Sequence, residues 1–296
     1  MKKLLILSGK GGTGKTTVAS AFIHLSKTKA YADCDVDAPN LHLLKQNHTH
    51  EKHFDYFGMD KAEIQSDLCI GCGRCQQNCR FDAITSDPLY AIDPFVCEGC
   101  GVCAWVCPEK AIVMQRVKAG DLSVFEGDAV FSTATLKMGS GTTGLLVSEV
   151  KKNLTTYAKE GPIAILDGSP GIGCPVIASI SGVDMVLMVT EPSVSGLSDL
   201  QRIVRTARIF NPKMAVCINK FDTNVTQSEA IIAYCNTEGI AWVGNIPYDV
   251  EAVKAINAGI TVDQLKSPVS AAIGEVFIKT FELLNEVVGD EMYKII

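Results

Sequence analysis

Eight of the twelve cysteines lie between residues 69 and 107 and could bind metal through their thiolates. They form two runs of the same spacing, C-x2-C-x2-C-x3-C. The first run is Cys69, Cys72, Cys75 and Cys79, and the second is Cys97, Cys100, Cys103 and Cys107. This spacing is typical of paired 4Fe–4S sites, in which the fourth cysteine of each run binds the other cluster.

The pattern therefore predicts two four-cysteine sites with exchanged fourth ligands. One set is Cys69, Cys72, Cys75 and Cys107, and the other is Cys79, Cys97, Cys100 and Cys103. Zinc is the alternative, because paired CxxC units also make four-cysteine zinc sites, but eight cysteines in this order favour iron–sulfur clusters. The first run ends with Arg80 where the second has Pro108. We expect so small a segment to fold only with its metal bound.

A glycine-rich segment near the start of the chain could bind phosphate. Residues 9–16 fit G-x-x-x-x-G-K-S/T and follow an apolar stretch, Lys2–Ser8. Glycines let backbone N–H groups converge on phosphate oxygens at the start of a helix. Lys15 would then reach the β- and γ-phosphates, and Thr16 would coordinate Mg²⁺.

The loop GKGGTGKTT resembles that of the MinD/ParA/Mrp superfamily of P-loop ATPases, which includes the nitrogenase iron protein. Its mark is Lys10, directly after the first glycine. The resemblance implies ATP and Mg²⁺ as ligands, and a homodimer in which Lys10 reaches the partner's nucleotide. The cysteine-rich segment resembles a bacterial ferredoxin inserted into such an ATPase.

Two acidic segments resemble the switches of this superfamily. Residues 33–40, the first switch, would use Asp35 to orient the attacking water near Mg²⁺, with Asp33 in support. Residues 167–171, the second switch, follow an apolar stretch. Asp167 would hold Mg²⁺ through water, and Gly171 would offer its N–H to the γ-phosphate.

The resemblance also implies an adenine site. Asn219 would read the base, and Pro247, Tyr248 and Asp249 would line its other side. The implied catalytic residues are Lys10, Lys15, Asp35 and Asp167, and those for Mg²⁺ are Thr16, Asp35 and Asp167. The implied nucleotide-binding residues are Gly9, Lys10, Gly11, Gly12, Thr13, Gly14, Lys15, Thr16, Thr17, Gly171, Asn219, Pro247, Tyr248 and Asp249.

Other possible ligands are weaker. Cys174 lies seven residues after Asp167, the offset at which the nitrogenase iron protein places a cluster ligand, so it is a candidate for a metal at a dimer interface. The alternative is a buried small apolar residue. His48, His50 and His53 are expected in a solvated loop, and Cys34, Cys217 and Cys235 in the core.

The elements that must position these residues alternate between strand and helix. After the phosphate loop comes a helix over about 16–27, and later apolar stretches at 163–166, 185–189, 215–218 and 241–243 are separated by helical patterns. This order predicts an α/β fold with a mostly parallel central sheet flanked by helices. We expect one ATPase domain from residues 1–60 and 116–296, and an inserted ferredoxin domain over 61–115. Residues 122–134 are expected to add strands to the sheet, and 269–288 a packed helix.

Composition limits the partners. The net charge is −6, which argues against nucleic acid as a general partner. No apolar stretch is long enough to span a membrane, and the acidic face of the C-terminal helix does not favour anionic lipid. We expect the first seven residues to form a buried strand and not an export signal. Twelve cysteines in a chain without an export signal indicate the reducing cytoplasm, where cysteines bind metal more often than they form disulfides.

The leading hypothesis is an ATP-hydrolysing iron–sulfur protein in which nucleotide controls electron delivery to a partner protein or metal centre. Because the insert follows the first switch in the chain, we expect movement of that switch to reach it. The alternatives are an ATP-dependent carrier or assembly protein for a metal cofactor, and a MinD/ParA-type positioning protein. The last would leave the cysteines unexplained.

Overall fold

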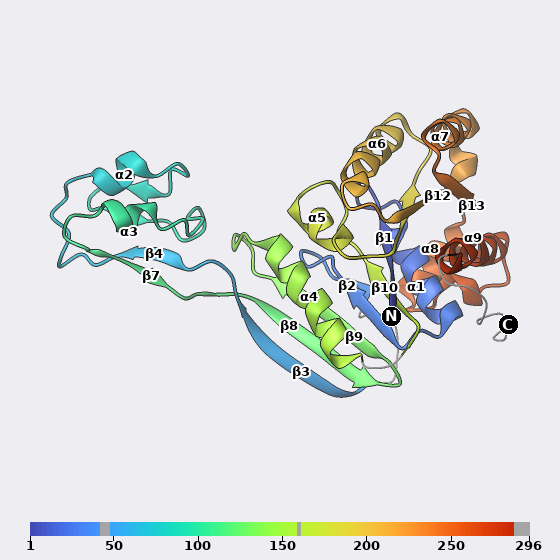
Figure 1. Cartoon of the computed structure of the whole chain (residues 1–296), viewed down its shortest axis with the longest axis horizontal. Coiled ribbons are helices and arrows are strands. Elements are labelled where there is room, and N and C mark those ends of the chain that lie inside the picture. The colour runs from blue at the N-terminus through green and yellow to red at the C-terminus, as the bar shows by residue number, and fades with distance from the viewer. Residues whose placement is uncertain (42–47, 159–160, 287–296) are drawn as a thin grey trace.

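A nine-stranded sheet organises the chain (Figure 1). The computed structural model describes residues 1–41, 48–158 and 161–286. In spatial order the strands are β13 (Ala241–Ile246), β12 (Lys213–Asn219), β11 (Met185–Thr190), β1 (Lys2–Leu7), β10 (Ile163–Asp167), β2 (Ala30–Asp33), β9 (Val130–Leu136), β8 (Lys118–Gly127) and β3 (His48–Phe57). The run from β13 to β9 is parallel, and β8 and β3 pair antiparallel beyond it. The predicted α/β fold with a mostly parallel sheet is confirmed.

Helices cover both faces of this sheet, because alternate residues of its central strands point to opposite sides. In β1, Leu5 and Leu7 pack with one group of helices, and Leu4 and Ile6 with the other. The first group is α4 (Thr143–Tyr157), α5 (Cys174–Ile180), α6 (Val194–Arg208) and α7 (Val225–Glu238). The second is α1 (Lys15–Ser26) and α9 (Pro268–Asn285), with α8 (Val250–Asn257) nearby.

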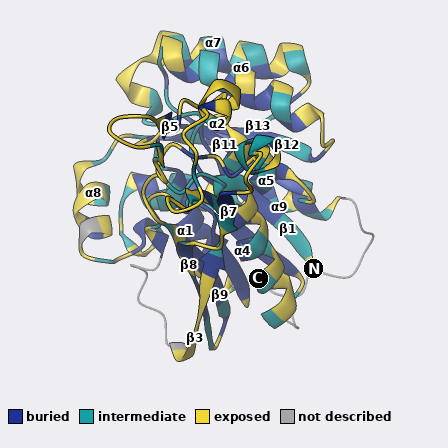
Figure 2. Ribbon diagram, turned by 90° about the vertical axis from the view of Figure 1, so that its left-hand side faces the viewer, coloured by how far each residue is buried: buried dark blue, intermediate teal, exposed yellow. Residues whose placement is uncertain are grey.

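The cysteine-rich segment stands away from the sheet, joined to it by the long pair β3 and β8 (Figure 1). Strands β4 (Lys61–Ile64) and β7 (Ile112–Gln115) pair at its base. Beyond them lie α2 (Arg74–Asn78), β5 (Ile84–Thr85), β6 (Ala91–Ile92) and α3 (Val102–Val106). Its residues are mostly exposed, whereas the central parallel strands of the main sheet are buried (Figure 2). We propose that residues 61–115 form a ferredoxin domain.

Two expectations about the segment between the first switch and the insert were wrong. His48, His50 and His53 do not lie in a loop: they belong to β3, whose backbone pairs with β8. Pairing across the sheet outweighs the polar composition, which suits an exposed edge strand. The insert is also not next to the first switch, because the ten residues of β3 lie between them.

The strands expected over residues 122–134 and the expected C-terminal helix are present in the structure. Strands β8 and β9 confirm the strands expected over 122–134. Helix α9 confirms the packed C-terminal helix to Asn285, and Val288 lies outside the described residues. Within the described part of the chain, no helix combines the length and apolar character that crossing a membrane requires.

Candidate nucleotide and cysteine sites

The phosphate loop joins β1 to α1, as the sequence predicted. Gly12 and Gly14 have φ of 78° and 91°, which favour glycine. A Cβ on Gly14 would lie only 2.2 Å from Asn219 Nδ2, so the loop needs glycine there for space as well. The backbone N–H groups at the start of α1 face the loop, which makes this end of the helix suited to an anion.

Lys15, Thr16 and Asp167 come together beside this loop. Lys15 Nζ and Thr16 Oγ1 each donate to the Asp167 carboxylate at 2.7 Å, and Asp35 lies 3.9 Å from Lys15 Nζ. Burial opposes the charged form of Lys15, but the carboxylate of Asp167 outweighs it and raises the lysine pKa. A cation, a hydroxyl and a carboxylate at a helix start are the groups that bind phosphate and Mg²⁺.

Asp33 holds the first switch in shape. Its carboxylate accepts N–H groups from Asp35 at 3.0 Å, Asn40 at 2.8 Å and Leu41 at 2.9 Å. Burial and the charge of Asp167 raise the pKa of Asp33 to about 7, and burial raises the pKa of Asp35 to about 6. Asp33 is therefore a positioning residue, whereas Asp35 faces Lys15 and is nearer the expected phosphate.

The raised pKa of Asp33 predicts a pH-dependent stability. Between about pH 4 and pH 7 the folded state keeps a proton that the unfolded state has lost, so stability falls as pH rises. Asp33 should contribute a slope of about 1.4 kcal/mol for each pH unit, and Asp35 should add to it below about pH 6. Urea unfolding without added Mg²⁺ or nucleotide measures it. The variant Asp33→Asn should flatten this part of the curve; equal curves for both proteins would contradict the assignment.

The second switch contacts the first directly. Cys34 donates its N–H to the Asp167 carbonyl oxygen at 2.7 Å, and Ser169 Oγ donates to the Cys34 carbonyl oxygen at 2.6 Å. The Gly171 N–H donates to the Ser8 carbonyl oxygen at 3.0 Å. Offering this N–H to a γ-phosphate would thus require that hydrogen bond to break. Movement of one switch would disturb the other.

Lys10 is held within its own chain by residues that sequence reasoning missed. Its Nζ forms an ion pair with Glu191 and donates to Ser195 Oγ at 3.2 Å. Lys220 Nζ donates to the Gly12 carbonyl oxygen at 3.0 Å and lies 3.8 Å from Glu191. Glu191 directly follows β11, so its place at the carboxyl edge of a parallel sheet could have identified it.

The adenine candidates lie in two places. Asn219 Nδ2 donates to the Thr13 carbonyl oxygen at 2.8 Å, which fixes the asparagine on the phosphate loop. The Tyr248 N–H donates to Asp222 Oδ1 at 2.8 Å, and the tyrosine side chain is half exposed. Asp249 caps α8 by accepting the Glu251 N–H at 2.8 Å. These bonds give Asn219 and Asp249 structural roles beside any contact with a base.

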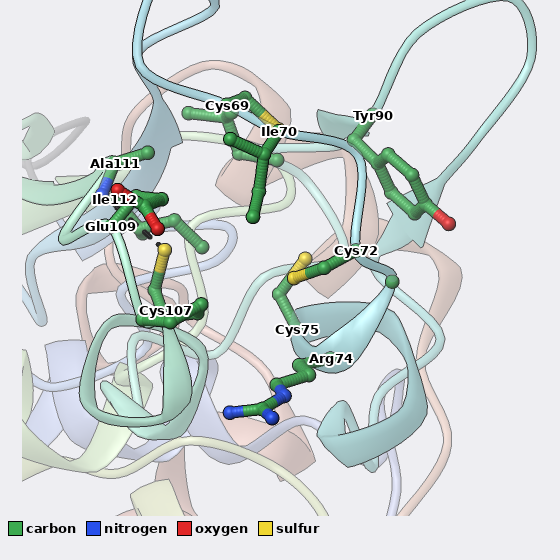
Figure 3. Close-up of a pocket in the computed structure, with 13 residues that line it drawn as sticks. Cys69, Ile70, Cys72, Arg74, Cys75, Tyr90, Cys107, Glu109, Ala111 and Ile112 are labelled. Carbon is green, nitrogen blue, oxygen red and sulfur yellow. Dashed lines mark hydrogen bonds between the residues drawn. The ribbon is translucent and has the colours of Figure 1, made fainter.

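Eight cysteines line two hollows, and each hollow is lined by one of the two sets of four named in the sequence analysis. The first hollow, about 360 Å³, is lined by Cys69, Cys72, Cys75 and Cys107. The second hollow, about 340 Å³, is lined by Cys79, Cys97, Cys100 and Cys103. In Figure 3, Cys107 lies across the first hollow from Cys72 and Cys75.

Each hollow brings together four thiols, the donor set that a 4Fe–4S cluster or a single zinc ion would use. Among the residues that the structure describes, no three His, Cys, Asp or Glu side chains are close enough to hold one metal ion. A 4Fe–4S cluster needs its four thiolates farther apart, since each binds a different iron. The Ala111 N–H donates to Cys107 Sγ at 3.3 Å (Figure 3), a contact that would stabilise a thiolate.

The four remaining cysteines differ in exposure. Cys34, Cys217 and Cys235 are buried, as expected for core residues. Burial raises the pKa of the first two thiols to about 12 and that of Cys235 to about 11, which makes them unreactive. Cys174 is exposed at the start of α5, so the alternative of a buried core residue is wrong for it.

A phosphate loop after the first strand of a parallel sheet, with Lys15, Thr16 and Asp167 beside it, defines a P-loop nucleotide-binding protein of the α/β class. The model of the CobQ/CobB/MinD/ParA nucleotide binding domain matches residues 4–262. The chain belongs to this family, within the MinD/ParA/Mrp superfamily.

Three similar proteins span nearly the whole chain. An uncharacterized protein of Methanocaldococcus jannaschii is 33% identical and covers 95% of this chain and 97% of its own. An iron-sulfur cluster carrier protein of Pyrococcus horikoshii is 24% identical, covering 97% of this chain and 88% of its own. In fold, the chain resembles the septum site-determining protein MinD of Pyrococcus horikoshii, complexed with Mg-ADP. That likeness has a TM-score of 0.57 at 17% identity and covers 98% of this chain and 99% of that one.

Proposed function

We propose that this protein binds and hydrolyses ATP and that its nucleotide state controls electron delivery through two 4Fe–4S clusters to a partner protein or metal centre. One observation carries the proposal. Two hollows, each lined by four cysteines in exchanged sets, occur in the same chain as the cluster of Lys15, Thr16 and Asp167. When bound, the clusters would supply one-electron transfer.

The chain's own residues divide the nucleotide chemistry. Lys15 would neutralise the β- and γ-phosphates once it leaves Asp167, and Thr16 would bind Mg²⁺. Asp167 would then hold water on Mg²⁺, and Asp35 would orient the attacking water. Asp33 would keep Asp35 in place through the backbone of the first switch.

A homodimer is part of the proposal, based on the superfamily resemblance. For Lys10 to reach a partner's nucleotide, it must first leave Glu191 and Ser195. A metal shared through Cys174 would likewise need a second protomer, and the exposure of this thiol supports that proposal. We propose a cytoplasmic location, with no nucleic acid or membrane as partner, from charge and cysteine content.

The gating proposal predicts that nucleotide changes the rate of cluster oxidation. Protein reduced without oxygen is mixed with an electron acceptor, and its visible absorbance is followed with ATP, with ADP and without nucleotide. We expect rates to differ roughly fivefold or more between ATP and ADP, the low end of typical coupling between sites. Lys15→Ala should abolish the difference while its clusters remain bound. Identical rates in all conditions would rule out gating.

A carrier of iron–sulfur clusters is the second candidate. It is favoured by the relative in Pyrococcus horikoshii, which is named an iron-sulfur cluster carrier protein and covers 97% of this chain. This function predicts that iron moves to an apo-ferredoxin, faster with ATP than without. Electron delivery predicts instead that the iron content stays constant over many turnovers. The lining of the hollows supports electron delivery, because each proposed cluster would be held by cysteines of both runs and would be hard to release.

A further inference from the structure

A glycine-rich segment between β9 and α4 contacts three separate parts of the molecule. Residues 136–144 read Leu-Lys-Met-Gly-Ser-Gly-Thr-Thr-Gly, and we call them the coupling segment. The segment carries two glycines of positive φ, Gly139 at 74° and Gly141 at 62°. Its course therefore depends on residues without a Cβ.

One end of the coupling segment contacts the first switch, and the other end contacts the helix that follows the second switch. The Leu136 N–H donates to the Val36 carbonyl oxygen, in the first switch, at 2.9 Å. A Cβ on Gly144 would lie 3.2 Å from the carbonyl oxygen of Cys174, in the helix that follows the second switch. Lys151 Nζ also donates to the carbonyl oxygens of Ala178 and Ser179, each at 2.8 Å. Helix α4 is thus fixed to α5 near both ends of α5.

The middle of the coupling segment contacts the second cysteine run. A Cβ on Gly139 would lie 2.8 Å from Cδ1 of Phe95, and one on Gly141 would lie 3.3 Å from Oε2 of Glu98. Glu98 lines the second hollow together with its neighbour Cys97. Any shift of these glycines would press on residues beside this hollow.

The second run is also fixed to the base of the insert. A Cβ on Gly99 would lie 2.3 Å from the Asp60 carbonyl oxygen, and Lys61 Nζ donates to the Cys97 carbonyl oxygen. The corresponding glycine of the first run is Gly71, and a Cβ placed there would have nothing within 4 Å. Of the two described hollows, the second is therefore the one whose cysteine run contacts the coupling segment.

We propose that the coupling segment transmits the nucleotide state of the switches to the second hollow and not directly to the first. This inference rests on the proposed function and names its route of control. It replaces the expected route along the chain from the first switch, because β3 separates that switch from the insert. Binding of Mg-ATP moves the switches, the switches move residues 136–144, and these reposition Phe95 and Glu98.

Hydrogen exchange of the cluster-loaded protein tests the route without relying on activity. With Mg-ATP added, exchange of backbone amides should slow or quicken roughly fivefold or more in residues 137–144 and 95–101, but not in 68–75. Phe95→Ala should keep the change in 137–144 and reduce it in 95–101, where Glu98 keeps its own contact with Gly141. Leu89→Ala is the matched control, since both side chains are exposed on the insert, at 69% and 72% for Leu89 and Phe95. Iron content and ATP affinity should match wild type in both variants.

The outcomes separate this inference from the proposed function. Persistence of the full change at 95–101 in Phe95→Ala, or an equal change at 68–75 in wild type, overturns the proposed route. Oxidation that depends on nucleotide together with unchanged exchange in 137–144 also overturns it and leaves gating intact. Exchange as expected, with oxidation rates independent of nucleotide, supports the route and removes electron gating.

Discussion

Two double cysteine variants are expected to differ in iron content, because the proposed arrangement exchanges the fourth ligands of the two clusters. Cys75 and Cys107 line the same hollow, so replacing both with alanine should remove one cluster and leave about four irons of about eight. Cys103 and Cys107 line different hollows, so replacing both should remove both clusters and leave almost no iron. Iron analysis and electron paramagnetic resonance of the reduced proteins measure these contents.

The difference in iron content between the two double variants does not depend on how strongly each single cysteine binds iron. If each run bound its own cluster, Cys103 and Cys107 would share a site, and the two results would be reversed. Loss of all iron in both doubles would contradict two separable sites. The single variant Cys235→Ala is the control, because this buried thiol lies in the α7 part of the main core. It should keep about eight irons.

Features set by short sequence spacing could be predicted. The phosphate loop needs its glycines, Lys15 and Thr16 at fixed offsets between a strand and a helix, and all of these are local. The two cysteine runs are likewise local, and their repeated spacing identified which residues share each hollow. The apolar stretches identified the buried parallel strands because burial on both faces removes polar residues from them.

Features set by contacts between distant residues could not be predicted. The place of Glu191 after a strand marks it as a candidate, but the contacts of Glu191 with Lys10 and of Lys220 with Gly12 depend on distances that no local pattern records. The contact between Gly139 and Phe95 could not be predicted either, because it depends on where the paired strands β3 and β8 place the insert. The three glycines over 139–144, directly before a helix, were nevertheless a visible signal of a tight segment.

The buried ion pair between Lys15 and Asp167 links the chemistry of the nucleotide site to the stability of the folded protein. Lys15 and Asp167 are 6% and 1% exposed and form an ion pair at 2.7 Å. Removing only the lysine leaves a buried carboxylate without its cation, which is expected to cost about 3 kcal/mol of unfolding free energy. A loss of activity in Lys15→Ala could then reflect lost catalysis or lost structure.

The double variant Lys15→Ala with Asp167→Asn separates these two effects. Lys15→Ala alone is expected to slow ATP hydrolysis roughly 10²–10³-fold, because the phosphates lose their preorganised cation. Adding Asp167→Asn removes the unpaired charge, so the free energy of unfolding should recover by about half or more. Hydrolysis should not recover, because the asparagine cannot replace the lysine or hold water on Mg²⁺ as a carboxylate does. Urea unfolding and phosphate release measure the two quantities, and Lys52→Ala, on the exposed strand β3, is the matched control. Recovery of hydrolysis in the double variant would mean that Lys15 supports the fold of this site and not its chemistry.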